Sequence, residues 1–332
     1  MKSIAVFNNK GGVGKTTLLC NLAAYLALER NRRILIIDAD PQCNATQLVF
    51  DDEDTEALYE DRKSFTIYNV IHPLSIGKGY SREIETKDRP NFGFDILIGD
   101  PRLSLKEDLL ARDWSQGLGG DARGLRTSYL FAELLTRCSD YDYVFFDVGP
   151  SLGSINRSIL LACDYFLSPM TIDIFSLKAI ENIRLAIESW RKQLKMSLEN
   201  LEDPDVLPTG VETEMRIRFS GYVTQQYKAR TDGSGGIVAV ESYERIMKKV
   251  APTIKTNFIE KLQPEYGKIN YNLGTIPNLF SLIPMAQFAR KPIFALKSAD
   301  GVRGAHFSRV NDARDLFEGI AVSFEKNLRA LA

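Results

Sequence analysis

The N-terminal segment of the chain places glycines, lysines and threonines in a spacing that suits phosphate binding. Residues 9–17 are Asn-Lys-Gly-Gly-Val-Gly-Lys-Thr-Thr, directly after a short apolar run. Glycines let the backbone fold tightly, so that its N–H groups point inward at phosphate oxygens. In this pattern Lys15 reaches the β- and γ-phosphates, the Thr16 hydroxyl binds Mg²⁺, and the Thr17 hydroxyl is placed to bond the α-phosphate. The segment therefore predicts a site for a nucleoside triphosphate with Mg²⁺.

Such a loop works only between a strand and a helix, and the surrounding sequence predicts that setting. Apolar runs typical of strands alternate with longer helical patterns, which indicates βαβ units. We expect an α/β fold with a mainly parallel twisted sheet and helices on both faces. We also expect a single domain over 1–332, with insertions at about 51–92 and 200–214. The expected strands are 3–8, 33–38, 94–98, 143–147, 165–169, 219–224 and 271–276, with helices over 16–29 and from the fifth strand through 190.

The overall composition carries no excess charge and no apolar anchor. There are 42 Lys and Arg against 43 Asp and Glu, so the net charge of −1 gives no general attraction to nucleic acid. With only two histidines, a His-rich metal site is excluded, and the four separated cysteines are typical of reduced thiols. No stretch approaches the roughly 18 apolar residues of a membrane span. No signal peptide is evident either, so we expect a cytoplasmic protein.

Two details of the loop differ from the general phosphate-loop pattern. Asn9 stands where the first glycine is usual, and a second lysine, Lys10, lies inside the loop. This string resembles the deviant Walker A loop of the ParA/MinD family of ATPases. The resemblance implies an ATP-dependent homodimer in which Lys10 reaches the partner's phosphates, so that hydrolysis depends on dimerisation. The nucleotide would be bound by Lys10, Gly11, Gly12, Val13, Gly14, Lys15, Thr16 and Thr17.

Two further segments resemble the switch motifs of the same family. The switch I segment (38–44) has the pattern D-x-D-P-Q, which implies that Asp40 orients the attacking water and that Asp38 supports the water shell of the metal. The switch II loop (147–153) would hold Mg²⁺ through Asp147 and sense the γ-phosphate with the Gly149 N–H. Its Val-Gly-Pro differs slightly from the Thr-Pro-Pro common in the family. The expected catalytic residues are thus Lys10, Lys15 and Asp40, and the expected metal ligands are Thr16, Asp38 and Asp147.

The resemblance is weaker where the family binds the base. Residues 221–225 and 275–278 lie where the family builds its adenine pocket, which implies contacts from Thr224 and Pro277. The asparagine that usually recognises the base is not evident in the first segment. Which residues contact adenine is therefore left open.

The resemblance implies a ParA-like partition or positioning ATPase for plasmid or chromosome segregation. Turnover would be slow and stimulated by a ParB-like adaptor. We expect non-specific DNA binding and nucleoid association, with no operator recognition, because no helix-turn-helix pattern precedes the first strand. Several late cationic residues are candidate DNA contacts, and the three on one predicted helix, Arg245, Lys248 and Lys249, are favoured. The others are Lys228, Arg230, Arg290, Lys291 and Arg303.

Other functions of this loop type make different demands on the sequence. A MinD-like positioning ATPase would need a basic, apolar C-terminal helix. The apolar stripe from Val310 to Leu331 instead carries mixed charges, so we expect it to pack on the sheet. An iron–sulfur protein would need paired cysteines, which Cys138 and Cys163 do not provide. A cargo-positioning ATPase could instead act through a partner protein alone; the acidic run 51–54 could contact a basic one, although we expect a solvated loop there.

Overall fold

One twisted sheet organises the molecule. The structure, a computed structural model, describes the whole chain apart from residues 62, 226–235 and 280. Within the described residues, the sheet order is β3-β4-β2-β5-β1-β6-β7-β8, and every neighbouring pair is parallel except β3 and β4. The strands are β1 (Lys2–Val6), β2 (Ile34–Asp38), β3 (Lys87–Arg89), β4 (Phe94–Leu97), β5 (Tyr143–Asp147), β6 (Tyr165–Thr171), β7 (Arg218–Gln225) and β8 (Asn272–Ile276).

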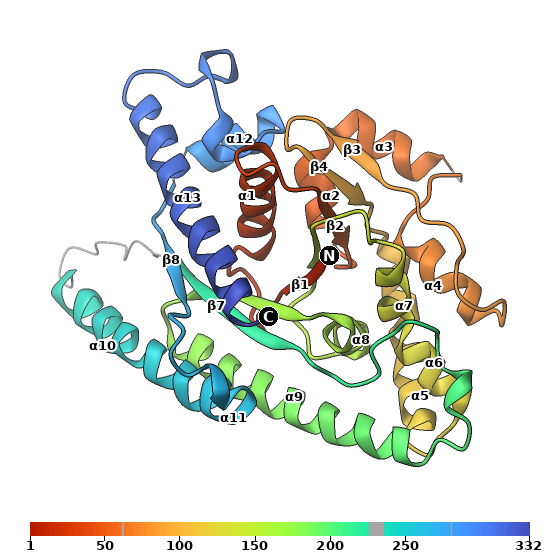
Figure 1. Cartoon of the computed structure of the whole chain (residues 1–332). Helices are drawn as coiled ribbons and strands as arrows, with labels where there is room; N and C mark the ends of the chain where they lie inside the picture. Colours follow the sequence, from red (N-terminus) through yellow and green to blue (C-terminus); the bar gives the residue numbers. More distant parts are fainter. Residues whose placement is uncertain (62, 226–235, 280) are drawn as a thin grey trace.

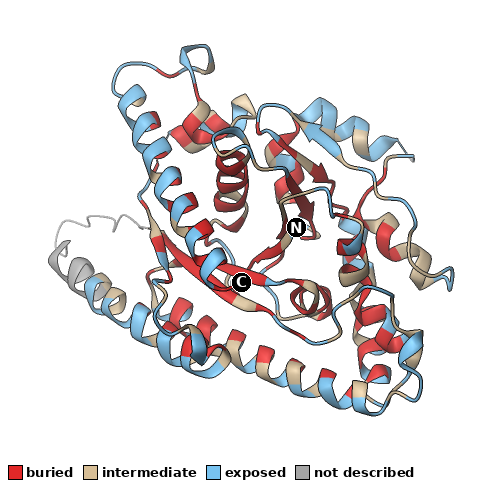
Figure 2. Cartoon of the chain, in the orientation of Figure 1, coloured by how far each residue is buried: buried red, intermediate tan, exposed pale blue. Residues whose placement is uncertain are grey.

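The seven predicted strands are confirmed, with ends within two residues of their expected positions. They are recognisable because central parallel strands are covered by helices on both faces and must be apolar throughout. All five residues of β2 are buried, as Figure 2 shows for the strands at the centre of the fold. The short strand β3 was not predicted. Its sequence, Lys-Asp-Arg, has no apolar residue, and only its antiparallel pairing with β4 makes it a strand.

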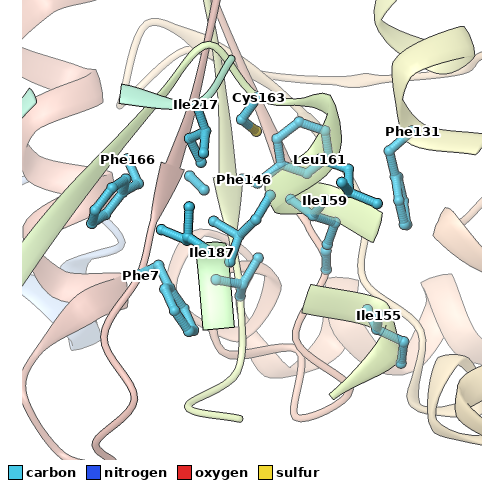
Figure 3. Close-up of a cluster of buried hydrophobic side chains, with 14 of the residues drawn as sticks. Phe7, Phe131, Phe146, Ile155, Ile159, Leu161, Cys163, Phe166, Ile187 and Ile217 are labelled. Atoms are coloured by element: carbon cyan, nitrogen blue, oxygen red, sulfur yellow. The ribbon is translucent and has the colours of Figure 1, made fainter. Parts of the chain in front are cut away.

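Helices cover both faces of the sheet, as expected (Figure 1). One apolar core lies under α1 and α13, and the other lies under α7, α8 and α9. Figure 3 shows part of the second core, where Phe146, Ile159 and Ile187 come from β5, α8 and α9. The helices are α1 (Lys15–Leu28), α2 (Asn44–Val49), α3 (Asp52–Glu60), α4 (Ile67–Ser75), α5 (Glu107–Gly117), α6 (Ala122–Ser128), α7 (Leu130–Thr136), α8 (Ser154–Ala162), α9 (Ile174–Glu199), α10 (Gly236–Ile254), α11 (Glu260–Leu262), α12 (Leu282–Ala289) and α13 (His306–Ala330).

The C-terminal stripe packs on the sheet, as predicted. Its apolar residues lie on α13 or just after it and are buried in the core shared with α1. They are Val310, Ala313, Phe317, Ile320, Phe324, Leu328 and Leu331. Since this apolar face is occupied by the fold, it is not available to a lipid surface. Across the described part of the chain, no helix is both long and apolar enough to cross a bilayer.

The two segments expected as insertions contain regular structure. Residues 51–92 include α3, α4 and β3, and residues 200–214 include the 3₁₀ turn Pro204–Val206. The expectation of a solvated loop at the acidic run was wrong. The Asp51 carboxylate accepts from the Asp54 N–H at 2.7 Å and caps α3. The three acids that follow occupy the first turn, where the helix dipole favours negative charge.

Candidate functional site

The carboxyl ends of the central strands meet at one edge, where an α/β sheet usually binds its ligand. The register aligns Val6 of β1 with Asp147 of β5, and aligns Asp147 in turn with Asp38 of β2. The glycine-rich loop leaves β1 at this same edge and ends at the start of α1. The predicted strand–loop–helix setting is therefore confirmed, with the two predicted metal-site carboxylates beside it.

Two glycines make the turn of the loop. Gly12 and Gly14 have φ values of 68° and 69°, in the left-handed region that favours glycine. Gly14 is also the N-cap residue that directly precedes α1, so the free N–H groups of the first helical turn face the loop. A β-carbon at Gly14 would collide with the side-chain amide of Gln225, the last residue of β7. The Gln225 side chain thus borders the loop on one side and would have to move if Gly14 carried a side chain.

Lys15 and Thr16 face the site from the first turn of α1. The Lys15 side chain is largely buried, and its ammonium donates to the Lys10 carbonyl at 3.4 Å. Burial lowers the pKa of Lys15, whereas the negative charges of Asp147 and Asp40 oppose that shift. The Thr16 hydroxyl donates to Asp147 Oδ2 at 2.7 Å. A cationic amine, a hydroxyl and a carboxylate therefore converge at the end of the loop.

Asp38 and Asp147 form a buried acidic pair that suits a cation. Asp38 Oδ2 accepts from the N–H and hydroxyl of Thr46 at 2.8 and 2.7 Å. Among the described residues, Oδ1 of Asp38 and Oδ1 of Asp147 are buried without a hydrogen-bond partner. Burial raises the pKa of Asp38 to about 7 and that of Asp147 well above its usual range; the charge of Asp40 adds to the rise at Asp38, and the charges of Asp38 and Asp40 add to the rise at Asp147. A Mg²⁺ ion with its water shell would satisfy both oxygens and restore both charges, so these residues fit the predicted metal.

Asp40 lies in the same cavity as the loop. It is buried, and its Oδ1 accepts from the Gln42 N–H at 3.0 Å. A β-carbon at Gly149 would stand 3.5 Å from Asp40 Oδ1, so the switch II loop passes directly beside this carboxylate. Asp40 and residues 11–16 line a cavity of about 1140 Å³, whose far wall is formed by α3. The predicted water-orienting residue therefore lies next to both the loop and Gly149.

Lys10 is held within its own chain. Its ammonium pairs with the Asp173 carboxylate and donates to Thr171 Oγ1 at 2.8 Å. Asp173 also begins α9, where it accepts from the N–H groups of Phe175 and Ser176 at 2.9 and 3.0 Å. Burial tends to raise the pKa of Asp173, but the bonds from Lys10 and Thr171 lower it overall. The Lys10 ammonium is thus engaged outside the cavity that residues 11–16 line.

A second cavity, of about 480 Å³, opens between the end of β8 and α13. It is lined by Thr275, Pro277 and Leu279 together with Asp312, Asp315 and Leu316. Thr224 lies behind this wall: it is fully buried, and its hydroxyl and that of Thr275 are 2.7 Å apart. Of the two residues predicted to contact the base, Pro277 faces a cavity, whereas Thr224 instead supports Thr275.

The candidate cationic residues do not form one patch. Arg245, Lys248 and Lys249 are exposed on α10, which lies at the lower left of Figure 1, whereas α12 lies near the top. Arg290 and Lys291 follow α12 and pair with Asp52 and Asp300 at 3.2 and 2.7 Å. Arg303 is exposed before α13, and Lys228 and Arg230 lie outside the described residues. The α10 cluster therefore remains the candidate DNA contact.

Several contacts at the site were not predicted from sequence. Three residues contact the site from other parts of the sequence. Asp173 is 163 residues from Lys10, Thr46 is 8 residues from Asp38, and Gln225 is over 200 residues from Gly14. Asp173 carries a weak signal, because an aspartate just before a helical pattern is a common cap. No local pattern connects it to Lys10. Cys138 and Cys163 are both buried in the core.

Known proteins resemble the chain over most of its length. A family model described as an AAA domain matches residues 1–200. The chromosome-partitioning ATPase Soj of Thermus thermophilus is 27% identical over 66% of this chain and 77% of its own. The chromosome partitioning protein ParA of Myxococcus xanthus is 30% identical over 59% of this chain and 61% of its own. The crystal structure of protein DIP2308 from Corynebacterium diphtheriae is 30% identical, covers 99% of both chains and has a TM-score of 0.75.

Proposed function

The chain belongs to the ParA/MinD-like family of P-loop ATPases, and we propose that it is an ATP-dependent dimerising switch that acts in partition or positioning of a cargo. One observation carries the proposal. Lys15, Thr16 and Asp40 line a single cavity at the carboxyl edge of the sheet, with Asp147 bonded to Thr16. This arrangement provides a cation for phosphates, ligands for a metal and a carboxylate for water.

Each of these groups has a role in phosphoryl transfer to water. The N–H groups of the loop and the Lys15 ammonium hold the phosphates. Thr16, Asp38 and Asp147 would hold Mg²⁺, which would supply positive charge against the phosphates. Asp40 orients the attacking water, and the Gly149 N–H contacts the γ-phosphate. Pro277 and Thr275 would flank the adenine, because the cavity they line adjoins β7, whose last residue packs on Gly14.

Lys10 provides the dependence on a partner. Its pair with Asp173 keeps it off the phosphates of its own chain. We propose that ATP favours a homodimer in which each Lys10 leaves Asp173 and reaches the partner's nucleotide. Hydrolysis then dissociates the dimer, so the bound nucleotide determines the oligomeric state that a partner detects. A ParB-like adaptor would accelerate this step, and the exposed cations of α10 would hold non-specific DNA in the ATP state, at the nucleoid.

The proposal is tested by substituting the two lysines of the loop separately. Lys15→Ala should lose ATP-Mg²⁺ binding, measured by titration of a fluorescent ATP analogue. Lys10→Ala should keep that binding but lose ATP-dependent dimerisation, measured by light scattering, together with most ATPase activity. Undiminished ATP binding by Lys15→Ala would refute the nucleotide site. Normal dimers and turnover in Lys10→Ala would refute only the paired-subunit switch.

A further inference from the structure

The helix that follows the switch II loop begins without a cap of its own. The residue before α8 is Gly153, which has no side chain to accept from the free N–H groups of the first turn. The first turn of α8 also contains no acidic residue. A helix start in this position needs an acceptor from elsewhere in the fold.

Glu107, the first residue of α5, supplies that acceptor. Its carboxylate accepts from the Ser154 N–H, and its Oε2 accepts from the Ile155 N–H at 3.2 Å. A β-carbon at Gly153 would collide with Glu107 Oε1, so the glycine makes room for the carboxylate. A negative charge at a helix N-terminus is favoured both by the N–H groups and by the helix dipole.

A second contact fixes α5 against α8. The Arg157 guanidinium lies 4.5 Å from the centre of the Trp114 ring and donates to the Leu110 carbonyl at 3.4 Å. Both Leu110 and Trp114 are buried residues of α5. Glu107 is therefore held at the start of α8 by the packing of two helices.

The capped turn is connected directly to the switch II loop. Asn156 Nδ2, in the first turn of α8, donates to the carbonyls of Gly149 and Ser151, both at 2.7 Å. Gly149 in turn passes beside the Asp40 carboxylate. The position of the first turn of α8 therefore sets the position of Gly149 relative to the water-orienting residue.

We infer that Glu107 is a positioning residue for ATP hydrolysis, which holds the first turn of α8 so that Gly149 faces the γ-phosphate beside Asp40. The inference rests on the proposed function. Glu107 is not among the residues that line the cavity at the loop, so its loss should affect the hydrolytic step and not the binding of ATP. A residue with a merely structural role would change both together, or neither.

The test compares Glu107→Ala with Glu107→Gln in the full chain. The alanine variant should lower kcat about tenfold, because the first turn of α8 loses its charged cap and Gly149 is no longer held in position for the reaction. Its KM and its affinity for a fluorescent ATP analogue should stay within about twofold of the unaltered chain. Glutamine keeps one acceptor oxygen, so it should restore a large part of kcat. Amide exchange at Ser154 and Ile155 should rise in the alanine variant and return toward normal in the glutamine variant.

Two further variants complete the experiment. Asp108→Ala removes an exposed acid from the same turn of α5 and should leave kcat unchanged. Gly153→Ala displaces the carboxylate and should reproduce Glu107→Ala, without adding to it in the double variant. Turnover that Glu107→Ala leaves unaltered, or a parallel loss of kcat and ATP affinity that glutamine does not rescue, would overturn the inference. Absence of ATP turnover in the unaltered chain would instead overturn the proposed function.

Discussion

At the scale of single residues, the site has buried negative charge in excess of its cations. Asp38, Asp40 and Asp147 are all buried around one lysine, Lys15, and two of their oxygens have no hydrogen-bond partner among the described residues. Buried carboxylates of this kind are stable only when protonated or bound to a cation. The charges of the site therefore suit Mg²⁺ as much as phosphate.

The pair of Lys10 and Asp173 leads to a prediction for Asp173→Asn. Asparagine caps a helix as well as aspartate does, so α9 should keep its start while Lys10 loses its ion pair. Both side chains are about one-third exposed, at 27% and 32%, so the gain is modest. Each dimer releases two such pairs, so we expect the concentration for half-maximal ATP-dependent dimerisation to fall by roughly 2- to 30-fold, twice the free energy of one exposed pair. Light scattering at several protein concentrations measures it.

A control separates this effect from a general loss of charge on α9. Lys178 and Glu181 form an exposed pair on the same helix at 3.0 Å, so Glu181→Gln should leave dimerisation unchanged. Weaker dimers in Asp173→Asn would contradict the prediction that Asp173 competes with the partner's nucleotide for Lys10. They would show that Asp173 supports the dimer itself.

The sequence predicted those residues whose neighbours in the chain define their role. Lys15 and Thr16 follow glycines in a local pattern, and Asp38 and Asp147 end apolar strands. Asp173 was not predicted as the partner of Lys10, because the contact forms only when β1 and β6 pair in the sheet. A contact that depends on the order of strands in the sheet cannot be predicted from the spacing of neighbouring residues.

At the scale of elements, α13 is held to the sheet by charge as well as by its apolar stripe. Glu325 is buried and accepts from Arg30 and Arg32 at 2.5 and 2.8 Å, where the chain passes from α1 to β2. Burial alone would raise the pKa of Glu325, but the two arginines outweigh it and lower the pKa from its ordinary value of 4.5. The ionised carboxylate therefore stabilises the fold.

We predict that Glu325→Ala lowers the free energy of unfolding by roughly 1–3 kcal/mol at pH 7, because two charged hydrogen-bond donors lose their acceptor. The arginines are partly exposed and can turn to water, which limits the loss. A lowered pKa means that the contribution is full above 4.5 and is lost as the pH falls through the folded-state pKa. Urea unfolding at pH 7 and pH 3.5 measures both effects.

The exposed Glu318 on the same helix provides the control for this prediction. Glu318→Ala should change the unfolding free energy little at either pH. A loss in Glu325→Ala that is as large at low pH as at pH 7 would indicate a packing defect in place of a lost charge.

Helices and strands were predictable where their own sequence determines them and contacts with distant residues are not needed. The buried strands are continuous apolar runs and the stripe of α13 has a helical period, and both were found. The segments 51–92 and 107–136 fold into short helices that the sequence analysis did not identify. Those helices have few turns each, and they depend on caps such as Asp51 and Asp121 more than on an apolar period.

At the scale of the whole molecule, the chain is nearly neutral, but three of its cations lie together on α10, away from the phosphate site. The net charge is −1, yet Arg245, Lys248 and Lys249 are all exposed on one helix. Phosphate contacts from such residues add up, and each one makes binding more sensitive to salt. A small local patch can therefore bind DNA without a basic overall composition.

We predict that reversing Arg245, Lys248 and Lys249 to Glu abolishes ATP-dependent retention of DNA on a filter, while ATP binding stays unchanged. Three fewer phosphate contacts should also remove most of the salt dependence of any residual binding. Reversal of Lys326 and Arg329, which are exposed on α13, lowers the total charge by four units, against six for the triple reversal, and should have little effect. Salt-sensitive retention that survives the triple reversal would exclude α10 as the DNA contact.

The capping of α9 by Asp173 has a mechanical consequence. The helix contains 26 residues, so it is about 39 Å long. Its buried residues Ile183 and Ile187 share a core with Val250 and Ile254 of α10. A lever of this length converts a tilt of about 5° at the cap into a displacement of about 3 Å at its far end. Asp173, which pairs with Lys10, thus lies at the start of the helix against which α10 and its exposed cations are packed.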